Sequence, residues 1–155
     1  MSEASEPVQS TERLMTFDVA GTTFALPISD ILEVVEQAGM SCVPRLPRSK
    51  GGVLNWHGEA LPVVAPHLLL GGEPIAQREP GEVQQFLVVS DRTDSSVQLG
   101  LPIDCVTALA FGDPPKSRGD EVVVERRPMD GRIVNVINPQ RLVARAAEII
   151  ESAVA

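Results

Sequence analysis

Few side chains in this sequence could act as a nucleophile or a general base. The candidates are Cys42, Cys105, His57 and His67, with Asp30 or Asp104 as a carboxylate that could orient a base. No Gly-x-Ser-x-Gly elbow, phosphate-binding loop or metal-type spacing of His and Cys accompanies these residues. We therefore predict that the protein is not an enzyme and holds no metal and no cofactor.

Composition and charge argue against several classes of partner. The 155-residue chain has a formal net charge of −8, and its basic residues form no run longer than Arg126-Arg127, so it lacks the basic surface that nucleic acid or anionic lipid attracts. No apolar run approaches the roughly 20 residues of a membrane span. The acidic N-terminus, 1–12, is expected to be a disordered tail rather than a signal peptide. We expect a cytoplasmic protein, with no nucleic acid and no direct membrane contact, whose Cys42 and Cys105 are buried thiols.

Apolar and polar residues alternate along most of the chain, which is the period of β-strands. The segment 31–36 is rich in β-branched residues and is expected to be a strand, although a short helix would fit the same pattern. Asp104 is expected to cap or terminate the strand before it. The predicted strands lie near 15–19, 22–26, 31–36, 53–56, 60–64, 86–89, 97–103, 122–124 and 133–137.

Two helices have clear start signals. Pro66 begins a short helix that a Gly-Gly pair ends, and a polar linker follows over 71–83. The C-terminal helix is predicted over 139–152. Asn138 is its N-cap, and Pro139 occupies the first helical position, where a missing N–H costs nothing.

Two motifs recur in the second half of the chain at nearly the same spacing. A Leu-Pro-Ile motif followed by two spaced aliphatic residues begins at Leu26 and again at Leu101. A Gly-x-x-aliphatic motif that ends in Pro-x-x-Leu begins at Gly58 and again at Gly131. The two matches indicate a structural duplication.

Each half would hold about five short strands and end in a helix that begins with proline. Five strands close most readily as a small barrel, because closure removes exposed strand edges. We predict two barrels side by side, one from 14 to about 70 and one from about 84 to 137. The groove between them would accept a ligand or a partner helix.

The order and spacing of these motifs resemble the CheW family, the coupling proteins of bacterial chemotaxis-type signalling. The resemblance implies an all-β fold of two intertwined five-stranded SH3-like barrels, with short helices and a C-terminal helix, so that 13–155 would form a single CheW-like domain. It covers residues 14 to about 150. The residues that carry it are Phe24-Ala25-Leu26-Pro27-Ile28, Val34-x-Glu36, Val43-Pro44, Pro47, Gly52-Val53-Leu54-Asn55-x-x-Gly58, Pro62-Val63, Leu69-x-Gly71, Gly100-Leu101-x-Ile103-Asp104-x-Val106 and Arg132-Ile133-Val134-Asn135-Val136.

The resemblance also implies a function and two binding sites. Such a protein is a non-catalytic adaptor that couples chemoreceptors to a CheA-type histidine kinase in chemotaxis or motility signalling, and it is recruited to receptor clusters. The cytoplasmic hairpin tip of the receptor would bind at Val34, Glu36, Gly52, Asn55, His57 and Gly58. The regulatory domain of the kinase would bind at Gly100, Leu101, Ile103, Asp104 and Val106.

Two positions depart from the family pattern. His57 stands where the family usually has Arg, and Ala65 stands where it commonly has Asp. The Arg would pair with the acid at the Glu36 position, and a shorter His that is not always charged should weaken this pair. Either the chain is a normal adaptor, or it is a divergent one that keeps a single partner and competes with a standard adaptor. The neighbouring Trp56 is either a core residue or an exposed binding anchor.

Overall fold

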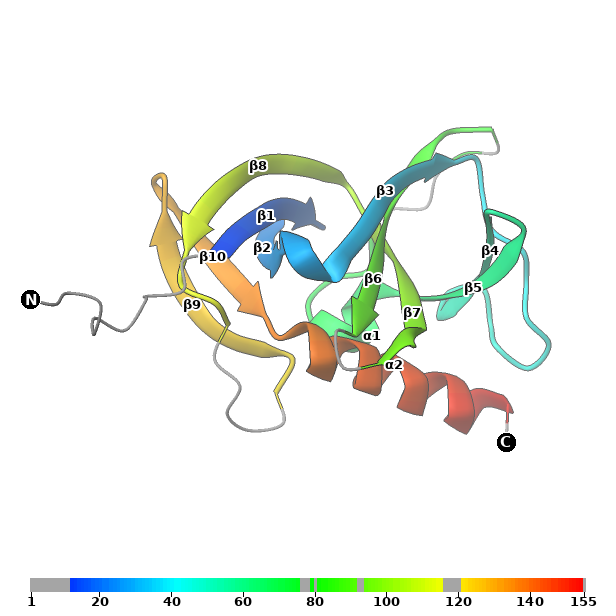
Figure 1. Cartoon of the computed structure of the whole chain (residues 1–155). Coiled ribbons are helices and arrows are strands. Elements are labelled where there is room, and N and C mark those ends of the chain that lie inside the picture. The colour runs from blue at the N-terminus through cyan, green and yellow to red at the C-terminus, as the bar shows by residue number, and fades with distance from the viewer. Residues whose placement is uncertain (1–11, 76–78, 80, 92–93, 116–120, 155) are drawn as a thin grey trace, which may run out of the picture.

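The computed structural model describes residues 12–75, 79, 81–91, 94–115 and 121–154 (Figure 1). The predicted tail lies outside these ranges except for Glu12, where the first strand begins. The helices are α1 (Pro66–Leu70) and α2 (Pro139–Val154), and a 3-10 turn covers Ile28–Asp30. The strands are β1 (Glu12–Val19), β2 (Thr22–Pro27), β3 (Ile31–Gln37), β4 (Gly51–Trp56), β5 (Glu59–Val64), β6 (Gln84–Asp91), β7 (Asp94–Ile103), β8 (Cys105–Gly112), β9 (Val123–Met129) and β10 (Arg132–Ile137).

The strands form two curled five-stranded sheets that lie side by side, with α2 running along one side of the molecule (Figure 1). The first sheet has the order β8-β1-β2-β10-β9, and the second has the order β3-β6-β7-β5-β4. Neighbouring strands are antiparallel except for β2 with β10 and β5 with β7, which are parallel. The predicted all-β class with two five-stranded units and a C-terminal helix is confirmed.

The two sheets do not coincide with the two halves of the chain. Each sheet combines the first two strands of one half with the last three strands of the other half. The first sheet joins β1 and β2 to β8, β9 and β10, and the second joins β6 and β7 to β3, β4 and β5. The predicted division into barrels at 14–70 and 84–137 is therefore corrected. The duplication itself is visible, because β5 leads into α1 at Pro66 in the same way that β10 leads into α2 at Pro139.

Strand β8 was not predicted from the sequence, whereas 31–36 is confirmed as a strand. In β8 the partly buried face carries Val106 and Ala110, but the exposed face carries Leu109 and Phe111, which are 61% and 70% exposed. Because both faces are apolar, the polar half of the alternation is missing.

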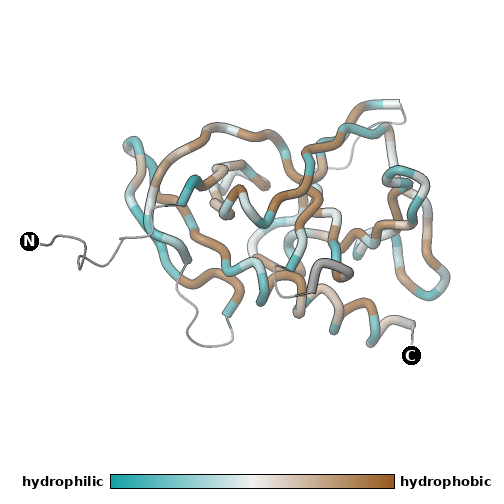
Figure 2. The backbone as a smooth tube through the Cα atoms, in the orientation of Figure 1, coloured by the Kyte–Doolittle hydropathy of each residue, from teal (hydrophilic) through white to brown (hydrophobic). Residues whose placement is uncertain are grey.

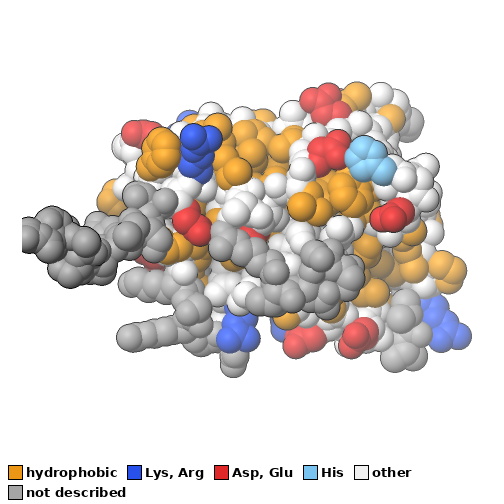
Figure 3. All heavy atoms as spheres, viewed as in Figure 1, with side chains coloured by type: hydrophobic (Ala, Val, Ile, Leu, Met, Phe, Trp, Pro, Cys, Tyr) orange, Lys and Arg blue, Asp and Glu red, His pale blue; other side chains and the backbone are white. Residues whose placement is uncertain are grey.

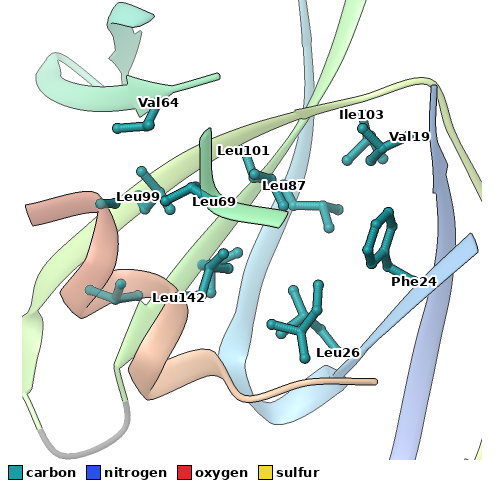
Figure 4. Close-up of a cluster of buried hydrophobic side chains, with 14 of the residues drawn as sticks. Val19, Phe24, Leu26, Val64, Leu69, Leu87, Leu99, Leu101, Ile103 and Leu142 are labelled. Atoms are coloured by element: carbon teal, nitrogen blue, oxygen red, sulfur yellow. The ribbon is translucent and has the colours of Figure 1, made fainter. Parts of the chain in front are cut away.

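The largest hydrophobic cluster joins the two sheets to the C-terminal helix. Figure 4 shows Leu26 of β2, Leu87 of β6, Leu101 of β7 and Leu142 of α2 in this one cluster, and all four are buried. Hydrophobic residues recur along the strands that line this cluster, as the alternating colours of the tube show (Figure 2). The predicted cap of α2 is also confirmed, because Asn138 Oδ1 accepts the N–H groups of the second and third helical residues at 3.0 and 3.2 Å.

A side chain, rather than backbone pairing, joins the two edge strands of the first sheet. Arg127 of β9 donates to the carbonyl oxygen of Pro114, just beyond β8, at 3.2 Å. It also forms an ion pair with Glu125 at 2.8 Å, and this hydrogen bond raises the pKa of Arg127. Both side chains are largely buried, and the hydrogen bond from Arg127 to the Glu125 carboxylate outweighs the effect of burial on the pKa of Arg127. The charged Arg127 therefore connects the open edges of the barrel.

Candidate docking site

The β4–β5 hairpin is closed by a two-residue turn, His57-Gly58, in which both residues have positive φ, +52° and +82°. This backbone shape is that of a type I′ turn, whose twist matches that of antiparallel strands and whose second position favours Gly. Asn55 Oδ1 accepts the N–H of Gly58 at 3.0 Å. Asn55 and Gly58 therefore shape the turn, and His57 is held at its exposed tip.

The hairpin is attached to strand β3 through one carboxylate. Glu33 Oε1 accepts the indole N–H of Trp56 at 2.9 Å and lies 2.8 Å from Nε2 of His57. Gln37, on the same face of β3, donates to the carbonyl oxygen of Asn55 at 2.8 Å. β3 and β4 are the two edges of the second sheet, so these side-chain bonds link the edges that no backbone ladder joins.

Two hydrogen bonds lower the pKa of Glu33 below its ordinary value. The bond from His57 has the larger effect, and the bond from Trp56 has the smaller one. The carboxylate is therefore ionised at neutral pH. Of the two alternatives for Trp56, the structure supports core packing, because the ring lies partly buried against the cluster that contains Leu54 and Phe86.

The predicted pairing of His57 with Glu36 is wrong. Side chains of a strand alternate between its faces, so Glu33 points toward the hairpin and Glu36 points away from it. Glu36 instead accepts a hydrogen bond from Nε2 of Gln85 at 3.3 Å. The acidic partner of His57 lies three residues earlier than the family pattern implies.

Leu32, Val34 and Glu36 form the exposed face of β3. Leu32 is 48% exposed and Val34 37% exposed, and Glu36 is exposed as well. Figure 3 shows hydrophobic and acidic side chains gathered beside the histidine of this view, over β3 and the β4–β5 hairpin. We call these three side chains the β3 face.

Gly52, also predicted to bind a receptor, is buried under the segment that precedes β4. A Cβ atom at Gly52 would lie 2.5 Å from the carbonyl oxygen of Ser41 and 2.9 Å from the sulfur of Met40. The position needs Gly because the chain passes directly over it, so its role is structural.

Three of the residues predicted to bind a kinase lie in the core. Leu101 and Ile103 have no exposed surface, and a Cβ atom at Gly100 would lie 3.0 Å from Cγ2 of Val63. None of the three is accessible to a partner, so the prediction is corrected for these residues. They match a family motif as components of the core.

The remaining two, Asp104 and Val106, flank the corner between β7 and β8. Asp104 Oδ2 accepts the N–H of Ala20 in the β1–β2 turn at 2.7 Å, and the N–H of Asp104 donates to the carbonyl oxygen of Asp18 at 2.8 Å. As expected, Asp104 terminates a strand. The corner also exposes Cys105, and Val106 is half-buried against the main core.

Comparison with known proteins explains the paired sheets and the motifs together. The family model of the CheW-like domain matches residues 13–147. The chain belongs to the CheW-like family. A similar solved structure is the scaffolding protein TtCheW from Thermoanaerobacter tengcongensis, which is 22% identical, has a TM-score of 0.64, and aligns over 84% of this chain and 91% of that one. No curated protein sequence matches at a significant level.

Proteins of the CheW family are scaffolding adaptors and not enzymes, so this chain is an adaptor of the chemotaxis type. Among the described residues, no three His, Cys, Asp or Glu side chains are grouped as metal ligands would be. Within the same ranges, neither helix has the length and apolar character needed to cross a bilayer.

Ala65, the second position at which this CheW-like chain departs from the family pattern, is the N-cap of α1. Its side chain makes no capping hydrogen bond, whereas the duplicated position before α2 holds Asn138, which makes two. The N–H of Leu68 donates to the carbonyl oxygen of Ala65 at 3.1 Å, so the start of α1 has a backbone hydrogen bond from its cap but no side-chain one.

Sequence reasoning missed three features of this CheW-like surface. Glu33 was not named as the partner of His57, and Leu32 was not named as part of the exposed face; the strict alternation of β3 is the signal that could have found both. Cys42 and Cys105 are exposed free thiols rather than buried ones, because they lie in a loop and at the outer start of an edge strand.

Proposed function

We propose that the protein couples chemoreceptors to a CheA-type histidine kinase in a chemotaxis or motility pathway, in the cytoplasm and within receptor clusters. The proposal rests on family membership and on one observation, the apolar and acidic β3 face beside a rigid hairpin. Two aliphatic side chains exposed next to each other on an edge strand are a surface that a partner can cover.

The receptor hairpin would lie on the β3 face, with His57 at its border and with Asn55 and Gly58 fixing the shape of the turn. Covering the exposed parts of Leu32 and Val34 would contribute about 1–2 kcal/mol. A micromolar complex needs about 8 kcal/mol. The receptor would therefore contact more of the molecule than these two side chains.

The kinase regulatory domain would bind a different surface, at the corner where Asp104 and Cys105 meet the β1–β2 turn at Ala20. This corner is the accessible part of the segment that the family resemblance links to the kinase. Two hydrogen bonds of Asp104 hold the corner and the turn together, which gives a partner a fixed shape to recognise.

The test is binding to two separate baits, a receptor hairpin fragment and a kinase regulatory domain from the same genome. Val34→Lys should weaken receptor binding at least tenfold and leave kinase binding unchanged. Cys105→Lys should do the reverse. Binding to only one bait would identify a specialised or competing adaptor, and binding to neither would refute the proposal.

A further inference from the structure

The β3 face presents two aliphatic side chains and then a carboxylate, in that order along the strand. Leu32, Val34 and Glu36 are alternate residues, so their side chains point the same way and follow one another at intervals of about 6.7 Å. Residues four apart on an α-helix are about 6 Å apart along its axis. A helix lying along β3 can therefore match all three side chains with three of its own, one turn apart.

Among the described residues, no Lys or Arg forms an ion pair with the carboxylate at the end of this row, Glu36. The hydrogen bond from the neutral amide of Gln85 is the only hydrogen bond or ion pair that Glu36 makes in the described structure. The nearby imidazole of His57 is already bound to Glu33, which points to the other side of the strand. On the face that Figure 3 shows, the Lys and Arg side chains in view lie away from the histidine.

A partner that covers Leu32 and Val34 would also remove water from Glu36. A carboxylate that loses water without gaining a cation or donor is costly, and the cost disfavours an apolar or acidic partner at that position. A Lys or Arg at the same position would turn this cost into a charge-assisted hydrogen bond.

We infer that the β3 face selects an amphipathic helix that carries two apolar residues one turn apart and a Lys or Arg one turn further. The inference rests on the proposed function and specifies the chemistry of the receptor helix that this surface accepts. Glu36 is then a specificity-determining residue, and Glu33 is a positioning residue that holds the hairpin.

The experiment measures binding of the full chain and its variants to the cytoplasmic hairpin fragment of a chemoreceptor from the same genome. Glu36→Gln should weaken binding about twofold to fivefold, and Glu36→Lys at least tenfold, because a missing attraction becomes a repulsion. Glu151→Lys on α2 is the matched control: it changes the net charge equally on an exposed residue far from β3, and should change binding less than twofold.

A charge exchange identifies the partner residue. Each Lys or Arg near the receptor tip is changed to Glu, and one of these changes should weaken the wild-type complex and restore binding to Glu36→Lys. Thermal unfolding and the fluorescence of Trp56, the only Trp, should be unchanged in the Glu36 variants, because this side chain is exposed.

Two outcomes overturn the inference alone: Glu36→Lys binds as well as Glu151→Lys, or no receptor charge change restores Glu36→Lys. If the wild-type protein binds no receptor hairpin, the proposed function fails and this inference fails with it. The two failures are thus distinguishable in one set of titrations.

Discussion

Replacing Leu101 by Ala tests whether the motif in the second half of the chain is a core element or a binding surface. Leu101 has no exposed surface and lies opposite Leu87 on β6, within the cluster that joins both sheets to α2. Losing its buried carbon atoms removes about 2–3 kcal/mol of transfer free energy, and the cavity left behind raises the expected loss of stability to about 3–4 kcal/mol.

Leu109→Ala is the matched control, since it is the same chemical change at a side chain that is 61% exposed. Its cost should stay below about 0.5 kcal/mol. Urea unfolding followed by circular dichroism gives both free energies. For a chain of this size a loss of about 3 kcal/mol also lowers the Tm by about 6–12 °C. If Leu101→Ala and Leu109→Ala unfold within 0.5 kcal/mol of each other, the assignment of Leu101 to the core is wrong.

Three further predictions concern local interactions. Ala65→Asn should supply the missing cap of α1 and raise the free energy of unfolding by about 0.5–1 kcal/mol, and an unchanged urea midpoint would contradict this. Arg127→Ala should cost about 1–3 kcal/mol, because the ion pair with Glu125 and the hydrogen bond to Pro114 across the barrel edges are both lost. The exposed neighbour in Arg126→Ala should cost less than about 0.5 kcal/mol. The pKa of Glu33 is lowered, so the stability that its ionised contacts contribute is fully present above the ordinary Glu pKa of 4.5 and is lost as pH falls through the lower folded-state pKa. The fluorescence of Trp56 should therefore change with a midpoint below pH 4.5. Glu33→Gln should abolish that transition.

Most of the strands, the helices and the duplication could be predicted from the sequence, but the exchange of strands between the two halves could not. Alternation and turn residues located nine of the strands and both helices, and the paired motifs indicated duplication. Local patterns do not encode which edge a strand joins. The first two strands of each half pair with the last three of the other half, and this arrangement became visible only in three dimensions.

The candidate site was predictable by region and not by residue. The resemblance located the β4–β5 hairpin and β3, but it selected Glu36 as the partner of His57, whereas the alternation of the strand directs Glu33 there. A register irregularity between Ile31 and Glu33 in the β3–β6 ladder adds to this difficulty, because it changes the pairing without any local signal. Residues that recur in a family motif, such as Leu101, can recur because they pack in the core.

Reconstitution of the signalling complex tests whether this chain links a receptor to a kinase. The measurement is the autophosphorylation rate of a CheA-type kinase on membranes that carry its chemoreceptor, with and without the protein, before and after the attractant is added. If the protein is the coupling adaptor, kinase activity responds to the attractant only when the protein is present, and Val34→Lys abolishes the response. A response of equal size without the protein, or no response with it, would refute the proposed coupling role.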